Sequence, residues 1–275
     1  MLYICGTPIG NLEDITMRQL RILQEVDLIA AEDTRHSRKL LHHFDIKTPM
    51  ISYHEHSNES KTDELLKQLL AGKKIAIISD SGMPVISDPG FQLVTACNQL
   101  KIPVTTVPGP TAFVSALLMS GFNPDSFVFL GFLNKKQKKD LSFLHREDKT
   151  VLIYEAPHKL VKTLTLFQEQ LNPQRKIAIA REITKLYEEV LHVTIQEACD
   201  YYQEHQPMGE YVLVLAGEVI KQEKNEMPIS DQVVAYQQKG ISKKDAIKQV
   251  AKDMDLPKNE VYKEVITLAP NIRHD

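Results

Sequence analysis

The amino-acid sequence predicts an α/β fold with two α/β domains, followed by a small helical appendage. Short apolar runs alternate with amphipathic segments through residues 1–120, which is typical of a mostly parallel, doubly wound sheet. In residues 121–218 the apolar runs outnumber the helical patterns, which indicates a second α/β domain with a mixed sheet. A chain of 275 residues is long enough for two domains that each bury a core.

Buried strands are expected in the first domain at residues 2–4, 28–31, 50–53, 75–78 and 104–107. The helical spacing of Met17, Leu20 and Leu23 predicts a first helix that Asp14 or Thr16 caps. Further helices are expected at residues 38–44, 61–71, 91–100 and 113–119. Charged residues at positions 32–36 close the second strand, at the sheet edge where ligand sites form.

The second domain is expected to start at the turn of residues 121–124, and its strands fall at residues 127–130, 151–154, 177–180, 190–193 and 211–215. Long helices are expected there only at residues 159–170 and 194–204. A polar linker at residues 221–225 leads to the helical appendage, expected over residues 226–275. Ser230 and Ser242 are its expected N-caps.

Composition limits the class of protein. The 33 Lys and Arg residues against 36 Asp and Glu give a formal net charge of -3, which argues against a tail-driven nucleic-acid binder but allows a local basic patch. Cys5, Cys97 and Cys199 are far apart, so reduced thiols are expected rather than a zinc site or disulfides. No leader-like or membrane-spanning run is visible, and we therefore expect a cytoplasmic protein with no membrane partner.

Three loops of Gly, Pro and small polar residues follow apolar runs, at residues 5–11, 79–90 and 108–112. The carboxyl ends of parallel strands lie at one edge of the sheet, so these loops predict a ligand crevice there. The first loop has neither the Gly-x-Gly-x-x-Gly pattern nor the Lys-Ser/Thr ending of a P-loop, which disfavours a nucleoside triphosphate. The second loop could instead be two consecutive turns capped by Asp80 and Asp88.

Four segments, at residues 6–16, 30–37, 79–90 and 154–159, resemble the tetrapyrrole methylase superfamily of S-adenosylmethionine-dependent enzymes. More closely, they are similar to the family of 16S rRNA cytidine 2′-O-methyltransferases, over essentially the whole chain. The resemblance implies that S-adenosyl-L-methionine binds in a cleft between the two α/β domains. It also implies a homodimer whose substrate is a cytidine ribose 2′-hydroxyl in the decoding region of 16S rRNA, within the small ribosomal subunit.

The resemblance further implies the residues that contact the cofactor. Those carried over by motif are Pro8, Ser81, Gly82, Met83, Ile86, Thr111, Ala112, Tyr154, Glu155 and Ala156. Glu182 falls where the wider superfamily uses another backbone contact.

Methyl transfer to a hydroxyl benefits from a base, although positioning and water exclusion can supply much of the acceleration. The candidate bases are Asp33, Asp88, Glu155, and a lysine with a lowered pKa, which would be Lys159 or Lys185. Each of these could instead form a salt bridge, a cap or a phosphate contact. Arg35 beside Asp33, and Arg181 with Lys185, are candidate phosphate or ribose ligands.

The densest positive run comprises Lys135, Lys136, Lys138 and Lys139, and the resemblance favours RNA contact over a solvated surface loop. In the appendage, Lys244 and Lys248 share a helix face and are weaker candidates for RNA contact. No metal site is expected, because His36 and His158 lack ligand spacing. A small-molecule methyltransferase of the same fold and a non-catalytic, cofactor-sensing RNA-binding module are the alternative functions.

Overall fold

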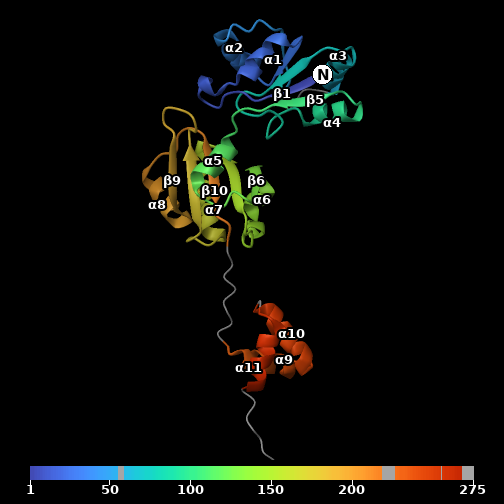
Figure 1. Ribbon diagram of the computed structural model, residues 1–275. Coiled ribbons are helices and arrows are strands. Elements are labelled where there is room, and N and C mark those ends of the chain that lie inside the picture. Colours follow the sequence, from blue (N-terminus) through green and yellow to red (C-terminus); the bar gives the residue numbers. More distant parts are fainter. Residues whose placement is uncertain (55–58, 219–226, 255, 268–275) are drawn as a thin grey trace, which may run out of the picture. The chain divides into compact units, whose positions relative to one another are not determined.

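The computed structural model describes residues 1–54, 59–218, 227–254 and 256–267 (Figure 1). The chain divides into two compact units, residues 1–218 and residues 219–275. The first unit contains two five-stranded sheets, and the second contains three helices. The predicted α/β fold class is confirmed.

The first sheet has the strand order β3-β2-β4-β1-β5, and all of its pairs are parallel. Its strands are β1 (Leu2–Cys5), β2 (Leu28–Ala31), β3 (Met50–Ser52), β4 (Ile75–Ile78) and β5 (Val104–Val107). Every residue of β2 and β4 is buried, as expected for strands that are covered on both faces. In this order β4, β1 and β5 are neighbours, so the loops that follow them leave the same part of the sheet edge.

Helices cover both faces of this sheet. On one face, α1 (Met17–Glu25) and α2 (Thr34–His43) bury Ile22, Leu23 and Leu41. On the other face, α3 (Glu59–Leu70) and α4 (Phe91–Gln99) bury Leu65 and Leu93. Thr16 caps α1, as predicted, and the short helix η1 (Leu12–Asp14) precedes it.

The second sheet has the order β6-β7-β10-β8-β9 and is mixed, because β6 and β7 are parallel while the other pairs are antiparallel. Its strands are β6 (Phe127–Phe132), β7 (Thr150–Glu155), β8 (Lys176–Arg181), β9 (Glu189–Thr194) and β10 (Tyr211–Leu215). One face packs against α7 (Pro157–Gln170) and α8 (Ile195–Glu204). The opposite face packs against α5 (Ala112–Ser120), although α5 precedes residue 121 in the sequence.

Three local predictions differ from the structure. Helix α2 begins at Thr34 rather than residue 38, because the Asp33 carboxylate caps its first turn. The lysine run is a short helix, α6 (Lys135–Lys139), rather than a loop, because Asn134 and Gln137 form a capping box. Ser230 is not an N-cap: its helix begins at Ile229 after Pro228.

The second unit is a helical module with its own core. It consists of α9 (Ile229–Gln238), α10 (Lys243–Asp253) and α11 (Lys258–Thr267). Val233, Ile247, Val250 and Val261 pack together in its centre. Ser242 caps α10, as predicted. Throughout the described part of the chain, no helix combines the length and the apolar character that crossing a membrane requires.

Candidate functional site

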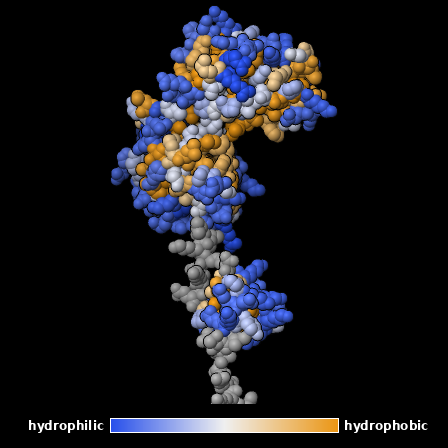
Figure 2. Space-filling model, viewed as in Figure 1, coloured by the Kyte–Doolittle hydropathy of each residue, from blue (hydrophilic) through white to orange (hydrophobic). Residues whose placement is uncertain are grey.

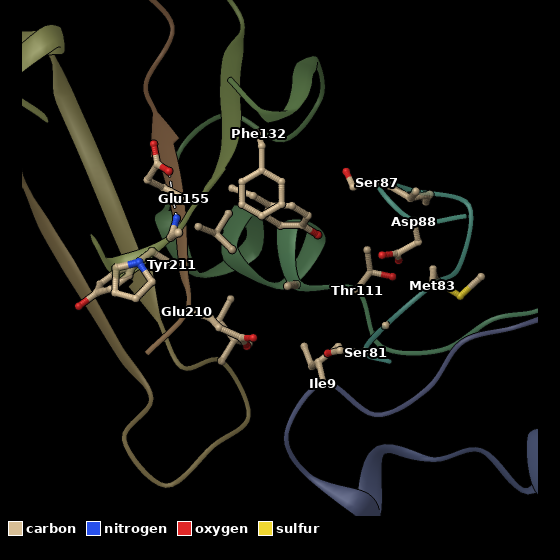
Figure 3. Close-up of a pocket in the computed structure, with 18 of the residues that line it drawn as sticks. Ile9, Ser81, Met83, Ser87, Asp88, Thr111, Phe132, Glu155, Glu210 and Tyr211 are labelled. Carbon is tan, nitrogen blue, oxygen red and sulfur yellow. Dashed lines mark hydrogen bonds between the residues drawn. The ribbon is translucent and has the colours of Figure 1, made fainter. Parts of the chain in front are cut away.

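The first unit contains a cavity of about 460 Å³ that residues from both sheets line (Figure 3). This volume lies within the range of small-molecule sites. The loops after β1, β4 and β5 contribute one side, where Figure 3 shows Ile9, Ser81, Met83 and Thr111. Residues at the ends of β6, β7 and β10 contribute the other side. In Figure 2, hydrophobic surface gathers where the two sheets of this unit approach each other.

Backbone contacts hold the three predicted loops together. The Thr7 N–H donates to the Gly82 carbonyl at 2.8 Å, and the Gly82 N–H donates to the Thr7 carbonyl at 3.1 Å. A Cβ atom on Gly6 would lie 2.9 Å from the Gly109 Cα, so the loops after β1 and β5 approach too closely for a side chain. The crevice that these loops predicted at the sheet edge is therefore present.

Side-chain hydrogen bonds fix the start of the second loop, residues 79–90. The Ser79 hydroxyl donates to the Gly82 carbonyl at 3.2 Å, and the Thr7 hydroxyl donates to the Ser79 carbonyl at 3.2 Å. Val85 and Ser87 have φ angles of 76° and 65°, in the left-handed region that non-glycine residues seldom adopt. Strain of this kind persists only where neighbouring contacts impose it, and it is frequent at ligand sites.

Glu155 forms a buried part of the opposite wall, with only 3% of its surface exposed. Its Oε2 accepts from Lys138 Nζ at 2.6 Å and from the Thr163 hydroxyl at 2.5 Å, and its Oε1 accepts from the Ala156 N–H at 3.0 Å. Both carboxylate oxygens are therefore already used by the protein. These bonds join the basic helix α6 to the pocket wall.

Asp88 is the lining carboxylate with the most perturbed ionisation. Burial, the nearby Glu32 carboxylate and the nearby Asp80 carboxylate together raise the pKa of Asp88 to about 7, against an opposing hydrogen bond from Ser79. On the facing wall, burial raises the pKa of the Tyr154 hydroxyl to about 12. Asp88 can thus change its charge near neutral pH, while Tyr154 stays protonated there.

Two helices begin at the pocket without a side-chain cap. The N-caps of α5 and α7 are Thr111 and Ala156, and neither accepts a hydrogen bond from its helix through a side chain. Both N-caps line the pocket. Uncapped N–H groups at a helix start favour a negatively charged partner.

Most residues implied as cofactor contacts line this pocket; those found there are Ser81, Gly82, Met83, Ile86, Thr111, Ala112, Tyr154, Glu155 and Ala156. Pro8 is not among the lining residues, and its neighbour Ile9 is. Glu182 is also not among them, because its Oε1 accepts from Lys185 Nζ and from the Glu210 N–H, both at 2.9 Å. Its carboxylate closes the turn after β8.

The candidate catalytic residues divide between the pocket and its surroundings. Glu155 and Asp88 line the pocket, whereas Asp33, Arg35, Lys159 and Lys185 are not among its lining residues. Arg35 holds the Asp33 carboxylate at 2.7 Å, and the Asp33 N–H donates to Asp80 at 3.1 Å, so this pair borders the second loop. Lys159 is exposed on α7.

Lys185 does not have the lowered pKa that a base would require. Burial acts to lower the pKa of Lys185, but hydrogen bonds to Glu210 and Glu182 outweigh it and raise that pKa. The corresponding nitrogen–oxygen distances are 2.7 Å and 2.9 Å. Lys185 is therefore a charged anchor between two carboxylates.

The candidate RNA-binding residues lie in different settings. Lys135, Lys136 and Lys139 are exposed on α6, whereas Lys138 turns inward to Glu155. Arg181 pairs with Glu189 at 3.5 Å and donates to the Met208 carbonyl. In the second unit Lys244 is exposed, and Lys248 pairs with Asp245 at 3.6 Å. Among the residues that the structure describes, no cluster of three or more His, Cys, Asp or Glu side chains could hold a metal ion.

Sequence reasoning missed several lining residues, which are Ile9, Ser87, Phe132, Pro157, Ile183, Glu210, Tyr211 and Val212. The start of β10 reaches the pocket because Tyr211 pairs with Glu155 at the same sheet edge. The apolar run of residues 211–215 predicts a strand, but it does not indicate with which strand that strand pairs. Ser87 could have been found, since it lies inside the second loop next to Asp88.

Comparison with known proteins gives consistent matches. The family model for Tetrapyrrole (Corrin/Porphyrin) Methylases matches residues 1–199. Proteins named ribosomal RNA small subunit methyltransferase I are 45% identical in Synechocystis, over 95% of this chain and 96% of the relative, and 44% identical in Bacillus subtilis, over 95% and 92%. The Thermotoga maritima protein of that name is 45% identical over 78% of this chain and 98% of the relative.

Solved structures share the fold at low sequence identity. The methyltransferase CobJ has a TM-score of 0.60 at 17% identity, over 79% of this chain and 94% of that one. A uroporphyrin-III C-methyltransferase from Thermus thermophilus, in complex with S-adenyl homocysteine, has a TM-score of 0.54 at 18% identity, over 80% and 98%.

Proposed function

The chain belongs to the ribosomal RNA small subunit methyltransferase I family of the tetrapyrrole (corrin/porphyrin) methylases, and from this we propose that it methylates the ribose 2′-hydroxyl of a cytidine in the decoding region of 16S rRNA. S-adenosylmethionine is the methyl donor in this proposal. The observation that carries it is the pocket, in which the motif loops after β1, β4 and β5 meet Tyr154, Glu155 and Ala156. The relatives' names supply the rRNA substrate class.

The residues of the pocket fit this cofactor. Ile9, Met83, Ile86 and Ile183 offer apolar surface to a flat adenine ring. The start of α5 at Thr111 has no side-chain cap at its N-cap residue and suits the carboxylate of its methionine part, although the Phe113 N–H in that turn already bonds to the Tyr154 hydroxyl. When bound, the cofactor supplies a methyl group on a positively charged sulfonium, which is already an activated donor. The protein therefore has to bind the cofactor and the ribose, orient them towards each other, and exclude water.

Asp88 is the group that the pocket offers as a base. Above its pKa of about 7 the Asp88 carboxylate is ionised and would accept the proton of the ribose hydroxyl. The methyl group would pass to that oxygen as its bond to sulfur breaks, which would leave the neutral thioether S-adenosylhomocysteine. Glu155 is less suited to this step, because both of its oxygens already accept hydrogen bonds from the protein. The Asp33 carboxylate likewise already accepts hydrogen bonds from the Arg35 guanidinium.

The natural substrate in this proposal is the rRNA within the small ribosomal subunit, and the enzyme acts as a homodimer in the cytoplasm. The exposed lysines of α6 support a nucleic-acid substrate, since ammonium groups gain from binding backbone phosphates.

The proposal is tested by supplying methyl-labelled S-adenosylmethionine with unmethylated small subunits, naked 16S rRNA, or a precorrin-type tetrapyrrole. Label is expected in the rRNA, and nucleoside analysis should recover it as 2′-O-methylcytidine. Label that enters only the tetrapyrrole would identify a small-molecule methyltransferase. Cofactor binding without any transfer would identify the non-catalytic RNA-binding module.

A further inference from the structure

Phe132 is an exposed aromatic side chain inside the pocket. It lines the cavity, yet 58% of its surface is exposed. Figure 3 shows its ring extending into the space between the two walls of the pocket, with Ser87 and Asp88 on the wall across from it. Phe132 and Asp88 both line this cavity, so an open aromatic face and the proposed base share one pocket.

A bulge in β6 gives Phe132 this direction. Phe129 pairs with Leu152, and Phe132 pairs with Tyr154, so three steps along β6 match two steps along β7. In a regular strand, residue 131 would face Tyr154 and residue 132 would point to the other side of the sheet. Gly131, with a φ of 60°, provides the extra residue, so Phe132 lies on the same side of the sheet as Tyr154, and both line the pocket.

The neighbouring rings leave Phe132 without a stacking partner. Phe129 stacks on Phe113, with centroids 4.1 Å apart and ring planes 18° from parallel. Phe132 meets only Tyr154, at 5.6 Å and with a tilt of 55°, among the ring contacts of the described residues. Leu133, the next residue, is buried and packs in the core, whereas the exposed Phe132 ring contributes little to that core.

Positive charges follow Phe132 directly along the chain. The buried Leu133 fixes the start of α6, and Lys138, bonded to Glu155 at 2.6 Å and to Thr163 at 2.9 Å, fixes its last turn. Lys135, Lys136 and Lys139 remain exposed, and none of them forms an ion pair with any residue that the structure describes. The helix thus carries three exposed, unpaired ammonium groups, and it begins three residues after Phe132 in the chain.

We propose that the base of the target nucleotide stacks on Phe132 while the phosphates beside it bind Lys135, Lys136 and Lys139. This inference rests on the proposed function, because it requires an RNA substrate. A ribose deep in a pocket can be reached only if its nucleotide leaves the base stack, and an extruded base needs a flat apolar surface to replace its neighbours. An aromatic ring beside lysines is the usual combination for single-stranded RNA.

The test compares Phe132→Ala, Phe132→Leu and Phe132→Tyr with the wild-type enzyme, by kcat/KM for small subunits and by calorimetric affinity for the cofactor. Phe143→Ala, an exposed phenylalanine outside the pocket lining, is the matched control. Phe132→Ala is expected to lower kcat/KM by on the order of tenfold to a hundredfold, with cofactor affinity within about twofold of wild type. Phe132→Leu, which keeps apolar volume without a π face, should also lose activity, whereas Phe132→Tyr should retain it.

Two results would overturn this inference while leaving the proposed function intact. One is wild-type kcat/KM in both Phe132→Ala and Phe132→Leu. The other is a loss of cofactor affinity that accounts for the whole defect, which would assign the ring to the cofactor instead of the RNA base. If the wild-type enzyme transfers no methyl group to rRNA, the proposed function itself fails, and this inference fails with it.

Discussion

Glu155 and Asp88 both line the pocket, but their surroundings prepare them for different roles. Glu155 is bonded at both oxygens, to Lys138, Thr163 and the Ala156 N–H. Burial opposes the ionisation of Asp88, and the nearby carboxylates of Glu32 and Asp80 oppose it further, so its pKa is raised. The first is therefore an anchor, and the second can exchange a proton near neutral pH.

Replacing Asp88 by Asn should lower kcat by about a hundredfold and remove its rise with pH. In the wild-type enzyme, kcat should increase as the pH passes through about 7, since only the ionised carboxylate accepts a proton. Glu32→Gln is the matched variant: removing this negative charge should move the rise to lower pH. A pH–rate profile of Asp88→Asn that still rises near pH 7 would show that another group is the base.

The same ionisation should affect stability. Asp88 has a higher pKa in the folded protein than in the unfolded chain, so its contribution is fully present below about pH 4 and is lost as the pH rises to about 7. Thermal melting of Asp88→Asn should therefore show increased stability relative to wild type at pH 8, and a smaller difference at pH 4.

Lys138→Met should destabilise the first unit by about 3 kcal/mol, because the buried Glu155 carboxylate loses its charged partner. Chemical denaturation measures this change. The double variant Lys138→Met with Glu155→Gln should recover part of the loss, since no buried charge remains, and Lys139→Met on the exposed side of α6 should have almost no effect. Equal stability of the Lys138 and Lys139 variants would contradict the anchoring role of Lys138.

At single positions, sequence patterns predicted the site only in part. The motif residues after β4 and β7 line the pocket because they lie in loops at strand ends. The difference between Lys138 and Lys139 could not be predicted, because both belong to one run of lysines. Their roles are set by the direction of a short helix relative to Glu155, which is 17 positions away in the chain.

At the scale of elements, β6 and α6 act together. The bulge at Gly131 directs Phe132 into the pocket, and the capping box of Asn134 with Gln137 starts the lysine helix two residues after it. A predicted strand segment overlaps every strand of both sheets. The inner strands β2 and β4 are apolar throughout because they are buried on both faces, whereas the edge strand β5 is a Val-Thr-Thr-Val run of β-branched residues. The bulge could not be predicted, since the run of residues 127–133 contains no break except Gly131 itself.

Neutralising the exposed face of α6 should reduce the salt dependence of RNA binding. If Lys135, Lys136 and Lys139 each bind a phosphate, their joint replacement by Gln should make the slope of log affinity against log salt concentration less steep by about 2. Cofactor affinity should not change. Lys67, Lys73 and Lys101, replaced together by Gln, form the control, and an unchanged slope in the α6 variant would remove these lysines from the RNA site.

At the scale of the whole chain, the pocket and the helical module are built from separate cores. The cluster around Val250 contains only residues of α9, α10, α11 and their turns. All lining residues of the pocket precede residue 213. Each unit therefore has a core of its own. The predicted linker at residues 221–225 lies outside the described residues and stays a prediction.

Val250→Asp in the full-length protein should unfold the helical module and leave the cofactor site intact, because it places a charge in a core where Val250 is fully buried. Cofactor affinity should stay within about twofold of wild type. KM for small subunits should increase, since the exposed Lys244 would lose its fixed position. Exposed Val234→Asp is the control, and loss of cofactor binding in Val250→Asp alone would show that the units depend on each other.

The strand order of the second sheet has a consequence for synthesis of the protein. The central strand β10 lies between β7 and β8, but it is the last strand of the sheet to be translated. Before it emerges, β6 with β7 and β8 with β9 have no hydrogen-bonded connection to each other. Because Glu210, Tyr211 and Val212 also line the pocket, a nascent chain can acquire its complete binding site only after the final strand has left the translating ribosome.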